Sequence, residues 1–374
     1  MSSTSILKKH SFRCDIKLHS QQLMDLILSV LRNATIRTLK KIKMKIPIYP
    51  LKFEPIYQYR LWGGRKLENL LSKPLPDNEP IGEAWILSDR KDHSSLVQEG
   101  DLKNKTITSL MEEYRYEIMG KNGLYYDRFP LLLKFLDCKE VLSVQVHPSD
   151  HQKELLPEGD TGKTEAWIVL ETSDDSKIFA GLKPGTNKEN LVESIKDKSV
   201  SERLHSFIPK QENAVFIESG TVHTLGGTVV FEVQENSDVT FRLYDWDRLD
   251  AKTGKPRDLQ IENAIQSINF NQGEIGPVTP VIDNSIKNSE ILFDNNHFKV
   301  WRIKNKEVFK VGFIDIPTIL VCIDGKGSMN YNNQEYNINK GEVMLLPAII
   351  GQLELLPNDE ITLFQITIPD KNSN

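Results

Sequence analysis

Two short segments of the sequence alternate polar side chains with apolar ones, as a strand does when one of its faces lines a polar cavity. In the first segment, Ser143, Gln145 and His147 alternate with two valines, so the three polar groups share a face. In the second, Lys163 and Glu165 share a face in the same way. A buried polar group costs free energy unless it finds a partner, and a divalent metal ion would satisfy Gln145 and His147 together. Taken alone, such a segment is more often an ordinary hydrogen-bonded pair than a metal site.

A third segment adds a second imidazole, because His223 ends the sequence Gly220-Thr-Val-His223 after a predicted strand. The combined donors would be two imidazole nitrogens, a carboxylate and an amide oxygen, a set that suits zinc or another first-row divalent ion. They are Gln145, His147, Glu165 and His223. Such a set leaves coordination positions open for water or substrate, which is typical of a catalytic site rather than a structural one.

The segments that must position these residues are mainly short β-branched and aromatic runs, broken by Gly, Pro, Asn and Asp, and they predict strands. The predicted strands of this part are Ala84–Leu87, Leu142–Val146, Ala166–Leu170, Ala214–Ile217 and Thr228–Val233. Two capping-box patterns, Ser109-x-x-Glu112 and Thr186-x-x-Glu189, predict helices that continue through Tyr114–Met119 and Leu191–Ile195. We expect these helices to decorate a β-barrel.

Residues 271–288 are rich in Gly, Pro, Asn and Ser and predict a linker, with a boundary between two β-rich parts near Glu290. The spacing of the strands in the second part predicts another small sandwich or barrel. These strands are Phe298–Ile303, Ile319–Ile323, Glu335–Ile338, Gly341–Leu346 and Ile361–Ile366. The Gly341–Pro347 segment resembles the place where a metal-binding cupin goes on to supply a histidine. No histidine follows here, so we expect this second part to hold no metal.

Several longer motifs carry a more specific signal. They are Gln145-Val-His-Pro-Ser-Asp150, Gly162-Lys-Thr-Glu-Ala-Trp167, Gly220-Thr-Val-His223, Gln234-Glu-Asn-Ser-Asp238 and Arg242-Leu-Tyr-Asp-Trp246, with Pro50–Ile56, Trp62-Gly-Gly64 and Gly82-Glu-Ala-Trp85 upstream. Together they resemble the type I mannose-6-phosphate isomerases, in their short bacterial form, over most of residues 49–370. One departure is Glu218-Ser219 before the glycine, where the family usually has Pro-Ala.

The resemblance implies a mainly β chain of two cupin-type (jelly-roll) β-barrel domains with a few helices, the first metal-binding and the second not. We expect a catalytic domain over residues 44–290 and a C-terminal domain over residues 291–374. The implied reaction is the reversible isomerisation of mannose 6-phosphate and fructose 6-phosphate, by proton transfer between C1 and C2 through an enediol(ate). The implied cofactor is one Zn²⁺ per chain, acting as a Lewis acid, and the family's four ligands fall on Gln145, His147, Glu165 and His223.

The resemblance also gives Arg242 an active-site role. A guanidinium group pairs bidentately with the oxygens of a phosphate or an enediolate, so either group is a suitable partner for this arginine. The alternative is a surface salt bridge between Arg242 and Asp245 or Asp247.

Ser143 and Lys163 match family positions proposed to hold the phosphate of the substrate, and Lys134 is a further candidate with the same charge as Lys163. The alternative for Lys163 is an ion pair with Glu165, and for Ser143 it is a hydrogen bond to the backbone.

The proton-transfer base stays open between two carboxylates. Glu232 alternates with Phe231 and Val233 on a predicted strand just after His223, so it could face the cavity with the metal ligands. Asp238 lies four residues before Arg242, and both carboxylates match positions proposed for this role in the family. The alternative for either one is a carboxylate that orients the arginine.

The composition bounds the class of protein. The 374 residues are 39% hydrophobic and 26% charged, with a net charge of -5, which disfavours general affinity for nucleic acid. Three widely spaced cysteines fit a reducing compartment, and no apolar run approaches the ~20 residues that span a bilayer. We expect a cytoplasmic protein, monomeric or weakly dimeric, that binds a phosphorylated hexose and neither nucleic acid nor membrane.

Residues 1–43 differ from the rest, with nine Lys and Arg against two Asp, a net charge of +7. We expect this basic extension to be poorly ordered and the native protein to begin at Met44. An organelle-targeting peptide is the alternative.

Two other functions compete with the isomerase. A cupin oxygenase or epimerase with iron or manganese more often has a His-x-His pair, whereas this chain has Gln145-x-His147. A non-catalytic sugar-binding or storage cupin would need neither Lys163 nor Arg242 beside the metal, and the fold alone does not exclude it.

Overall fold

The computed structural model describes residues 48–371, which belong to one compact unit. The extension predicted over residues 1–43, and the start proposed at Met44, lie outside the described residues. The described part is mainly β, as the sequence predicts, and most of its strands form sheets of nine, seven and four strands. None of the helices in this part is long and apolar enough to cross a membrane.

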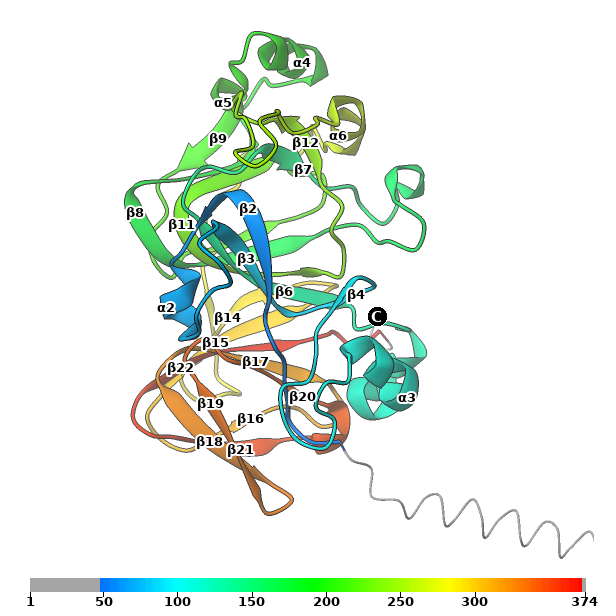
Figure 1. The fold of residues 1–374 in the computed structure, drawn as a ribbon, viewed down its shortest axis with the longest axis vertical. Helices are drawn as coiled ribbons and strands as arrows, with labels where there is room; N and C mark the ends of the chain where they lie inside the picture. The colour runs from blue at the N-terminus through cyan, green and yellow to red at the C-terminus, as the bar shows by residue number, and fades with distance from the viewer. Residues whose placement is uncertain (1–47, 372–374) are drawn as a thin grey trace, which may run out of the picture. The chain divides into compact units, whose positions relative to one another are not determined.

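The nine-stranded sheet carries most of the predicted site. Its strands are β2 (Ile56–Gly64), β3 (Ile81–Leu87), β6 (Leu131–Cys138), β7 (Val144–Val146), β8 (Glu165–Leu182), β9 (Leu204–Phe207), β10 (Ala214–Ile217), β11 (His223–Glu235) and β12 (Phe241–Tyr244). Their order is β10-β8-β11-β6-β3-β2, while β7 pairs with both β11 and β12, and β9 pairs with β8. Strands β8 and β11 are the longest and pair along most of their length, so they form the centre of this curved sheet (Figure 1).

Strand β11 shows how one strand serves two environments. Val229, Phe231 and Val233 are buried in a large apolar core on one face of the strand. Glu232 and Gln234 alternate with them and are also buried, although they are polar. Because successive side chains of a strand point to opposite faces, the apolar face packs into the core and the polar face is left for the site.

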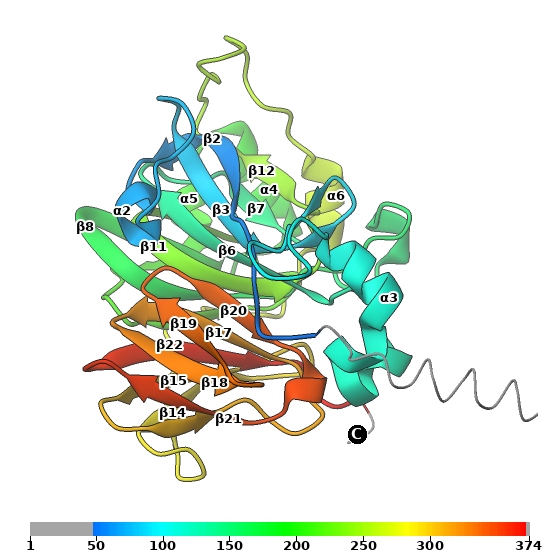
Figure 2. The same ribbon diagram turned by 60° about the horizontal axis from the view of Figure 1, so that its bottom comes forward.

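The C-terminal part is a sandwich of the other two sheets, which Figure 2 shows packed against the nine-stranded sheet. The seven-stranded sheet consists of β1 (Leu51–Lys52), β20 (Val343–Leu346), β17 (Thr318–Asp324), β22 (Ile361–Thr367), β15 (Lys299–Asn305), β14 (Ser289–Asp294) and β13 (Val281–Asp283), in that order. The four-stranded sheet consists of β16 (Phe309–Val311), β21 (Leu353–Pro357), β18 (Lys326–Tyr331) and β19 (Gln334–Asn339). Every strand predicted for this part is present.

Both faces of the central strands of the seven-stranded sheet are buried. In β17, Ile319 and Val321 belong to the core shared with the nine-stranded sheet, whereas Leu320 and Cys322 belong to the core inside the sandwich. This explains why the strand is a continuous apolar run rather than an alternating one. The C-terminal part therefore lies against the back of the sheet that holds the site.

Both predicted helices are present, but their predicted caps are wrong. Helix α3 (Ile107–Met119) is capped by Thr106, whose side chain accepts a hydrogen bond from the Ser109 N–H. Helix α4 (Lys188–Lys196) is capped by Asn187, which exchanges hydrogen bonds with Asn190. In each case a polar residue one to three positions away satisfies the free N–H groups of the first turn, which is all that a cap requires.

The remaining elements are short. They are α2 (Leu67–Leu71), α5 (Val200–Arg203), α6 (Ile261–Ser267), the 3₁₀ turns η1 (Gly120–Leu124), η2 (Lys153–Leu155) and η3 (Ala348–Ile350), and the two-stranded sheet of β4 (Asp89–Arg90) and β5 (His93–Ser94). Among them, α6 follows β12 and packs beside it, close to the site.

The segment predicted as a linker, residues 271–288, runs from one large sheet to the other and contains the short strand β13. Both β1 and β13 pair into the seven-stranded sheet, although they lie before residue 290. The division into residues 44–290 and 291–374 stays a prediction. These two strands come from the first predicted domain but belong to the sheet of the second.

Phe231 provides a test of how the two large sheets depend on each other. Its ring is fully buried and lies 5.6 Å from that of Phe135 in the same sheet and 5.5 Å from that of Phe364 in the other. Phe231→Ala should lower the free energy of unfolding in urea by about 3–5 kcal/mol, because it leaves a cavity between the sheets. The control Ile314→Ala alters a side chain that is 83% exposed and should change it by less than about 0.5 kcal/mol. Equal effects of the two substitutions would contradict this packing.

Candidate metal centre and active-site pocket

Three of the four predicted metal ligands meet in the structure. The Nε2 atoms of His147 and His223 each lie 3.4 Å from an oxygen of Glu165, and all three side chains are almost fully buried. The ligand atoms lie within 4.8 Å of one another. His147 directly follows β7, Glu165 begins β8 and His223 begins β11, so three separate segments of the sequence form one cluster.

The register of the sheet brings the fourth predicted ligand to this cluster. Strand β7 lies between β11 and β12, and its Gln145 is directly opposite His223 on one side and Arg242 on the other. Directly paired residues of an antiparallel sheet have their side chains on the same face. The register therefore aligns His223, Gln145 and Arg242 in one row.

Both imidazoles are oriented by the backbone. The Nδ1 atom of His147 lies 2.8 Å from the carbonyl oxygen of Val239, and that of His223 lies 2.9 Å from the carbonyl oxygen of Thr221. A neutral imidazole that donates through Nδ1 presents the lone pair of Nε2 to a metal. Gly220 makes the turn before this segment possible, because its φ of +88° is one that side chains rarely allow.

The pKa values favour this neutral form. Burial, followed by the positive charge of Lys163, lowers the pKa of His147 to about 3, although the charge and hydrogen bond of Glu165 act to raise it. Burial also lowers the pKa of His223. Burial by itself raises the pKa of Glu165, but Lys163 and the two imidazoles outweigh this and hold it well below its usual range. The cluster is thus an ionised carboxylate with two neutral imidazoles.

Several polar atoms of this cluster have no aligned hydrogen-bond partner in the described part of the chain. They are Nε2 of His147 and both carboxylate oxygens of Glu165. One of these oxygens lies 2.8 Å from Lys163 Nζ, but the other and the His147 nitrogen have no such partner among residues 48–371. Buried polar atoms are normally satisfied, so the cluster fits a cation held between them. Gln145 lies next to these residues: its Nε2 is 3.2 Å from Nε2 of His223, and rotation of the amide by 180° would place its oxygen there instead.

A second group with suitable residue types, Asp150, Glu235 and His297, fits a metal less well. Nδ1 of His297 already lies 3.1 Å from an oxygen of Glu235. Burial lowers the pKa of His297, but the hydrogen bond and charge of Glu235 outweigh burial and raise it. A protonated imidazole has no lone pair for a metal, and Asp150 is exposed.

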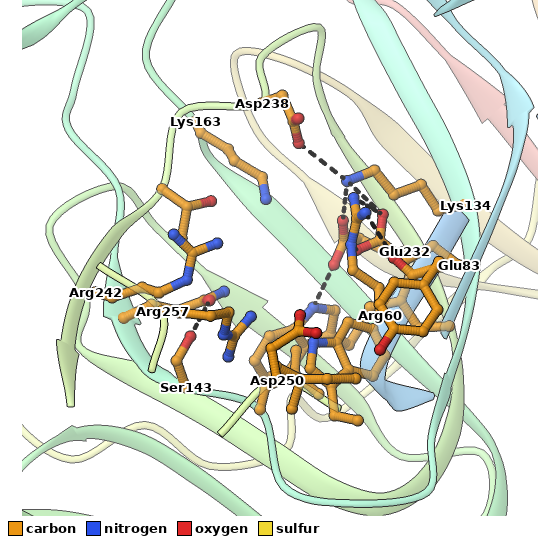
Figure 3. Close-up of a pocket in the computed structure, with 18 residues that line it drawn as sticks. Arg60, Glu83, Lys134, Ser143, Lys163, Glu232, Asp238, Arg242, Asp250 and Arg257 are labelled. Carbon is orange, nitrogen blue, oxygen red and sulfur yellow. Dashed lines mark hydrogen bonds and ion pairs between the residues drawn. The ribbon is translucent and has the colours of Figure 1, made fainter. Parts of the chain in front are cut away.

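A pocket of about 370 Å³ opens beside the cluster. The residues that line it include Gln145, Ser143, Lys163, Trp167, Lys134, Glu232, Asp238, Arg242, Arg60, Glu83, Thr240, Asp250 and Arg257. Figure 3 shows two groups of side chains: Lys134, Glu232, Glu83 and Arg60 on one side, and Arg242, Arg257 and Ser143 on the other. Every residue predicted to bind substrate or transfer a proton lines this pocket.

On the first side, buried charges compensate each other. Lys134 Nζ lies 3.5 Å from Glu232, 3.7 Å from Glu83 and 3.9 Å from Asp238, and Glu83 also pairs with Arg60 at 2.7 Å. Burial raises the pKa of Glu83, but the charges of Arg60 and Lys134 outweigh burial and hold it well below its usual range. Glu83 is therefore an ionised counter-charge.

Glu232 has the opposite character. Its carboxylate is buried and accepts a hydrogen bond from Trp167 Nε1 at 3.0 Å, while its other oxygen has no aligned hydrogen bond from the described residues. Burial and the negative charge of Glu165 raise its pKa, more than Lys163 and Lys134 lower it. Direct cross-strand pairing places Glu232 between Trp167 and Lys134, on the face that lines the pocket.

Arg242 does not make either of the surface salt bridges considered for it from the sequence. Asp245 is bonded to Arg248 and Arg257 instead, each at 2.6 Å, and Asp247 pairs with Lys198 at 2.8 Å. Nε of Arg242 has no hydrogen-bond partner among residues 48–371. Its guanidinium group is thus held at the pocket without a carboxylate of its own.

Lys163 and Ser143 each line the pocket and also bond to a neighbouring side chain. Lys163 forms the ion pair with Glu165 that the sequence allows, at 2.8 Å. Ser143 shares a hydrogen bond with the side chain of Gln145 rather than with the backbone. Both residues therefore contact a proposed metal ligand directly.

Arg60, Glu83 and Arg257 line the pocket but were not predicted as site residues. Glu83 lies in the motif Gly82-Glu-Ala-Trp85, and its alternation with the apolar residues of a strand could have indicated it. Arg257 lies in an irregular segment, where no periodic pattern indicates which side chains face a cavity.

Two family profiles match the chain: "Phosphomannose isomerase type I, catalytic domain" over residues 51–167, and "Mannose-6-phosphate isomerase, cupin domain" over residues 293–362. The mannose-6-phosphate isomerase ManA of Bacillus subtilis is 35% identical over 312 residues, which cover 82% of this chain and 95% of that protein. The chain belongs to the type I phosphomannose isomerase family.

Other relatives of this phosphomannose isomerase agree. The probable mannose-6-phosphate isomerase GmuF of Bacillus subtilis is 34% identical over 316 residues, covering 82% of this chain and 96% of that protein. The crystal structure of the mannose 6-phosphate isomerase from Bacillus subtilis matches with a TM-score of 0.77 and 29% identity, covering 85% of this chain and 99% of that one. The predicted family, cupin fold and isomerase class are confirmed, which sets aside an oxygenase and a non-catalytic cupin.

Metal binding by this phosphomannose isomerase can be measured without any assay of activity. After chelation and dialysis against zinc, the protein should retain one ion per chain and unfold at a higher temperature than the metal-free form, because the ion binds only the folded chain. Glu165→Gln removes the anionic donor and should abolish both effects.

The matched control for this experiment is Asp150→Asn, in the second group of residues. It should retain the ion and the thermal shift. Loss of the ion in Asp150→Asn, with retention in Glu165→Gln, would place the metal at the second group instead.

Proposed function

We propose that the chain interconverts mannose 6-phosphate and fructose 6-phosphate by moving a proton between C1 and C2 through an enediolate. The observation that supports this most directly is that two features of a phosphomannose isomerase adjoin one pocket: a buried cluster of metal-ligand type lies beside the pocket, and a carboxylate with a raised pKa lines it. An aldose–ketose isomerisation needs a base, a means of stabilising negative charge on oxygen, and an anchor for the phosphate.

We propose zinc as the cofactor, one per chain, held by Gln145, His147, Glu165 and His223. The donor atoms fit it: two neutral imidazoles with outward-facing Nε2 atoms, one ionised carboxylate and one amide. Bound there, zinc would supply Lewis acidity toward the oxygens of the sugar. Lys163, ion-paired to Glu165 at 2.8 Å, keeps that carboxylate ionised and directed toward the cluster.

Glu232 is the better of the two candidates for the proton-transfer base. It is buried, its raised pKa brings it closer to neutral pH, and Trp167 holds one of its oxygens, while the other has no aligned hydrogen bond among the described residues and lies 3.5 Å from Lys134 Nζ. A base is most effective when its pKa lies near the working pH. Asp238 lines the same pocket, but its side chain is 44% exposed, which makes it better suited to orienting Lys134 or the substrate.

Arg242 would pair with the oxyanions of the substrate. Its place next to Gln145 across the strand pair puts it beside the proposed metal, and no carboxylate of the described chain competes for it. Ser143 and Lys163 also line the pocket and would contribute hydrogen bonds or charge to the phosphate. Lys134 is less suited to this role than the sequence suggests, because three carboxylates already surround it.

A cytoplasmic location, a monomeric or weakly dimeric state and the absence of nucleic-acid or membrane partners stay predictions. They do not affect the argument from the pocket.

A coupled assay of fructose 6-phosphate formation from mannose 6-phosphate tests the reaction. Activity should fall to background on chelation and return with zinc. Gln145→Ala and Arg242→Ala should each lower kcat/KM by a factor of about 100 or more, since each removes a contact to the metal or to developing charge. The exposed-site variant Ile314→Ala should match the wild type. Full activity of the wild type after chelation and of both site variants would refute the proposal.

The base can be assigned by comparing Glu232→Gln with Asp238→Asn. Both substitutions preserve side-chain shape and remove one carboxylate. Glu232→Gln should lower kcat by about 10²–10⁴ with little change in KM, as expected for a general base, and Asp238→Asn by less than about tenfold. The reverse order would assign proton transfer to Asp238.

A further inference from the structure

The carboxylate of Asp245 binds the guanidinium groups of two arginines near the pocket, and the guanidinium group of Arg242 lies close by. Asp245 accepts hydrogen bonds from Arg257 through Nε at 2.8 Å and Nη2 at 2.6 Å, and from Arg248 through Nη2 at 2.6 Å. Arg242 is bonded to neither carboxylate of the 245–247 segment. Of these three arginines, Arg242 and Arg257 line the pocket and Arg248 does not.

The segment from residue 245 to 260 returns to strand β12, and this return fixes Arg257 beside the site. The N–H of Gln260 donates to the carbonyl oxygen of Arg242 at 3.0 Å, and the N–H of Arg242 donates to Oε1 of Gln260 at 3.2 Å. Figure 3 shows the side chains of Arg242 and Arg257 next to each other on one side of the pocket, with Ser143 close to both.

Both guanidinium groups have donors left over. Arg257 uses Nε and Nη2 on Asp245, and its Nη1 makes no hydrogen bond to the described residues. Nε of Arg242 is also without a partner there. Burial and the positive charge of Arg257 lower the pKa of Arg242. Two like charges held together in this way are stabilised by an anion that both can contact.

The opposite side of the pocket offers no such place for an anion. Lys134 is surrounded by Glu83, Glu232 and Asp238, and Arg60 is hydrogen-bonded to both oxygens of Glu83. A dianion placed there would have to compete with these carboxylates for the two cations. Because the charge is unevenly distributed, an anionic group of a substrate would bind on the side of Arg242 and Arg257.

We propose that Arg257 is a substrate-binding residue that holds the phosphate group of the sugar phosphate, with Arg242 between it and the metal ligand Gln145. A phosphate monoester carries a charge of about -2 near neutral pH, and a guanidinium fork matches two of its oxygens. Asp245 sets the orientation of the Arg257 fork, so that Nη1 is presented to the ligand. This inference rests on the proposed function and names the residue that recognises the phosphate of that substrate.

The test compares Arg257→Met with its matched control Arg248→Met. Each substitution leaves Asp245 bonded to the other arginine, so the two variants share any structural effect of weakening this carboxylate's contacts. In Arg257→Met, KM for mannose 6-phosphate should rise by about 10- to 100-fold with kcat within about threefold of the wild type, because a charge-assisted contact is lost. Arg248→Met should leave KM within about twofold, and Arg257→Lys should fall between Arg257→Met and the wild type.

Binding of inorganic phosphate, measured by calorimetry, separates this inference from the proposed reaction. The wild type and Arg248→Met should bind phosphate, and Arg257→Met should bind it at least about tenfold more weakly. If the wild type fails to isomerise mannose 6-phosphate but shows this phosphate pattern, the proposed function fails and the phosphate site stands. Equal phosphate affinity in all three proteins, or equal KM increases in both methionine variants, would overturn the role of Arg257.

Discussion

The buried polar face of strand β11 is the constraint on which the rest of the structure depends. His223 and Glu232 lie on this face with almost no exposure to solvent, so each requires a partner that water cannot supply. The neighbouring strands provide them: Gln145 opposite His223, and Trp167 and Lys134 on either side of Glu232. The register of the sheet therefore determines which polar side chains of the site are neighbours. A shift of the register by one residue would turn the shifted strand's side chains to the other face of the sheet.

The opposite, apolar face of β11 shows what the C-terminal part contributes to the stability of the nine-stranded sheet. Phe231 and Val233 belong to a core that the seven-stranded sheet completes from behind, through residues such as Phe364. A sheet with a polar, charged inner face gains little stability from that face, since buried charges at best offset their own desolvation. The C-terminal part supplies the apolar burial that holds the catalytic sheet in its register.

The balance of charge differs between the two sides of the pocket. On the side of Lys134, carboxylates and cations compensate each other, which leaves Glu232 with a raised pKa among groups that can orient it. On the side of Arg242 and Arg257, positive charge exceeds negative charge and donors stay unused. The proposed proton transfer and the proposed anion binding therefore use different sides of the pocket, and Gln145 and Lys163, which contact the candidate metal cluster, also line it.

The sequence by itself determined the β character of the chain, most strands, and which polar residues share a face, because alternation along a strand is a local property. It also indicated the metal-ligand set, through motifs that resemble a known family. The tertiary structure decided what depends on contacts between distant segments: which residues cap the helices, the exchange of β1 and β13 between parts, the carboxylates around Lys134, and the placement of Arg257. Asp245 illustrates the reason, since nothing in its neighbourhood predicts that it would bind Arg257, twelve residues away in an irregular segment, and leave Arg242 free.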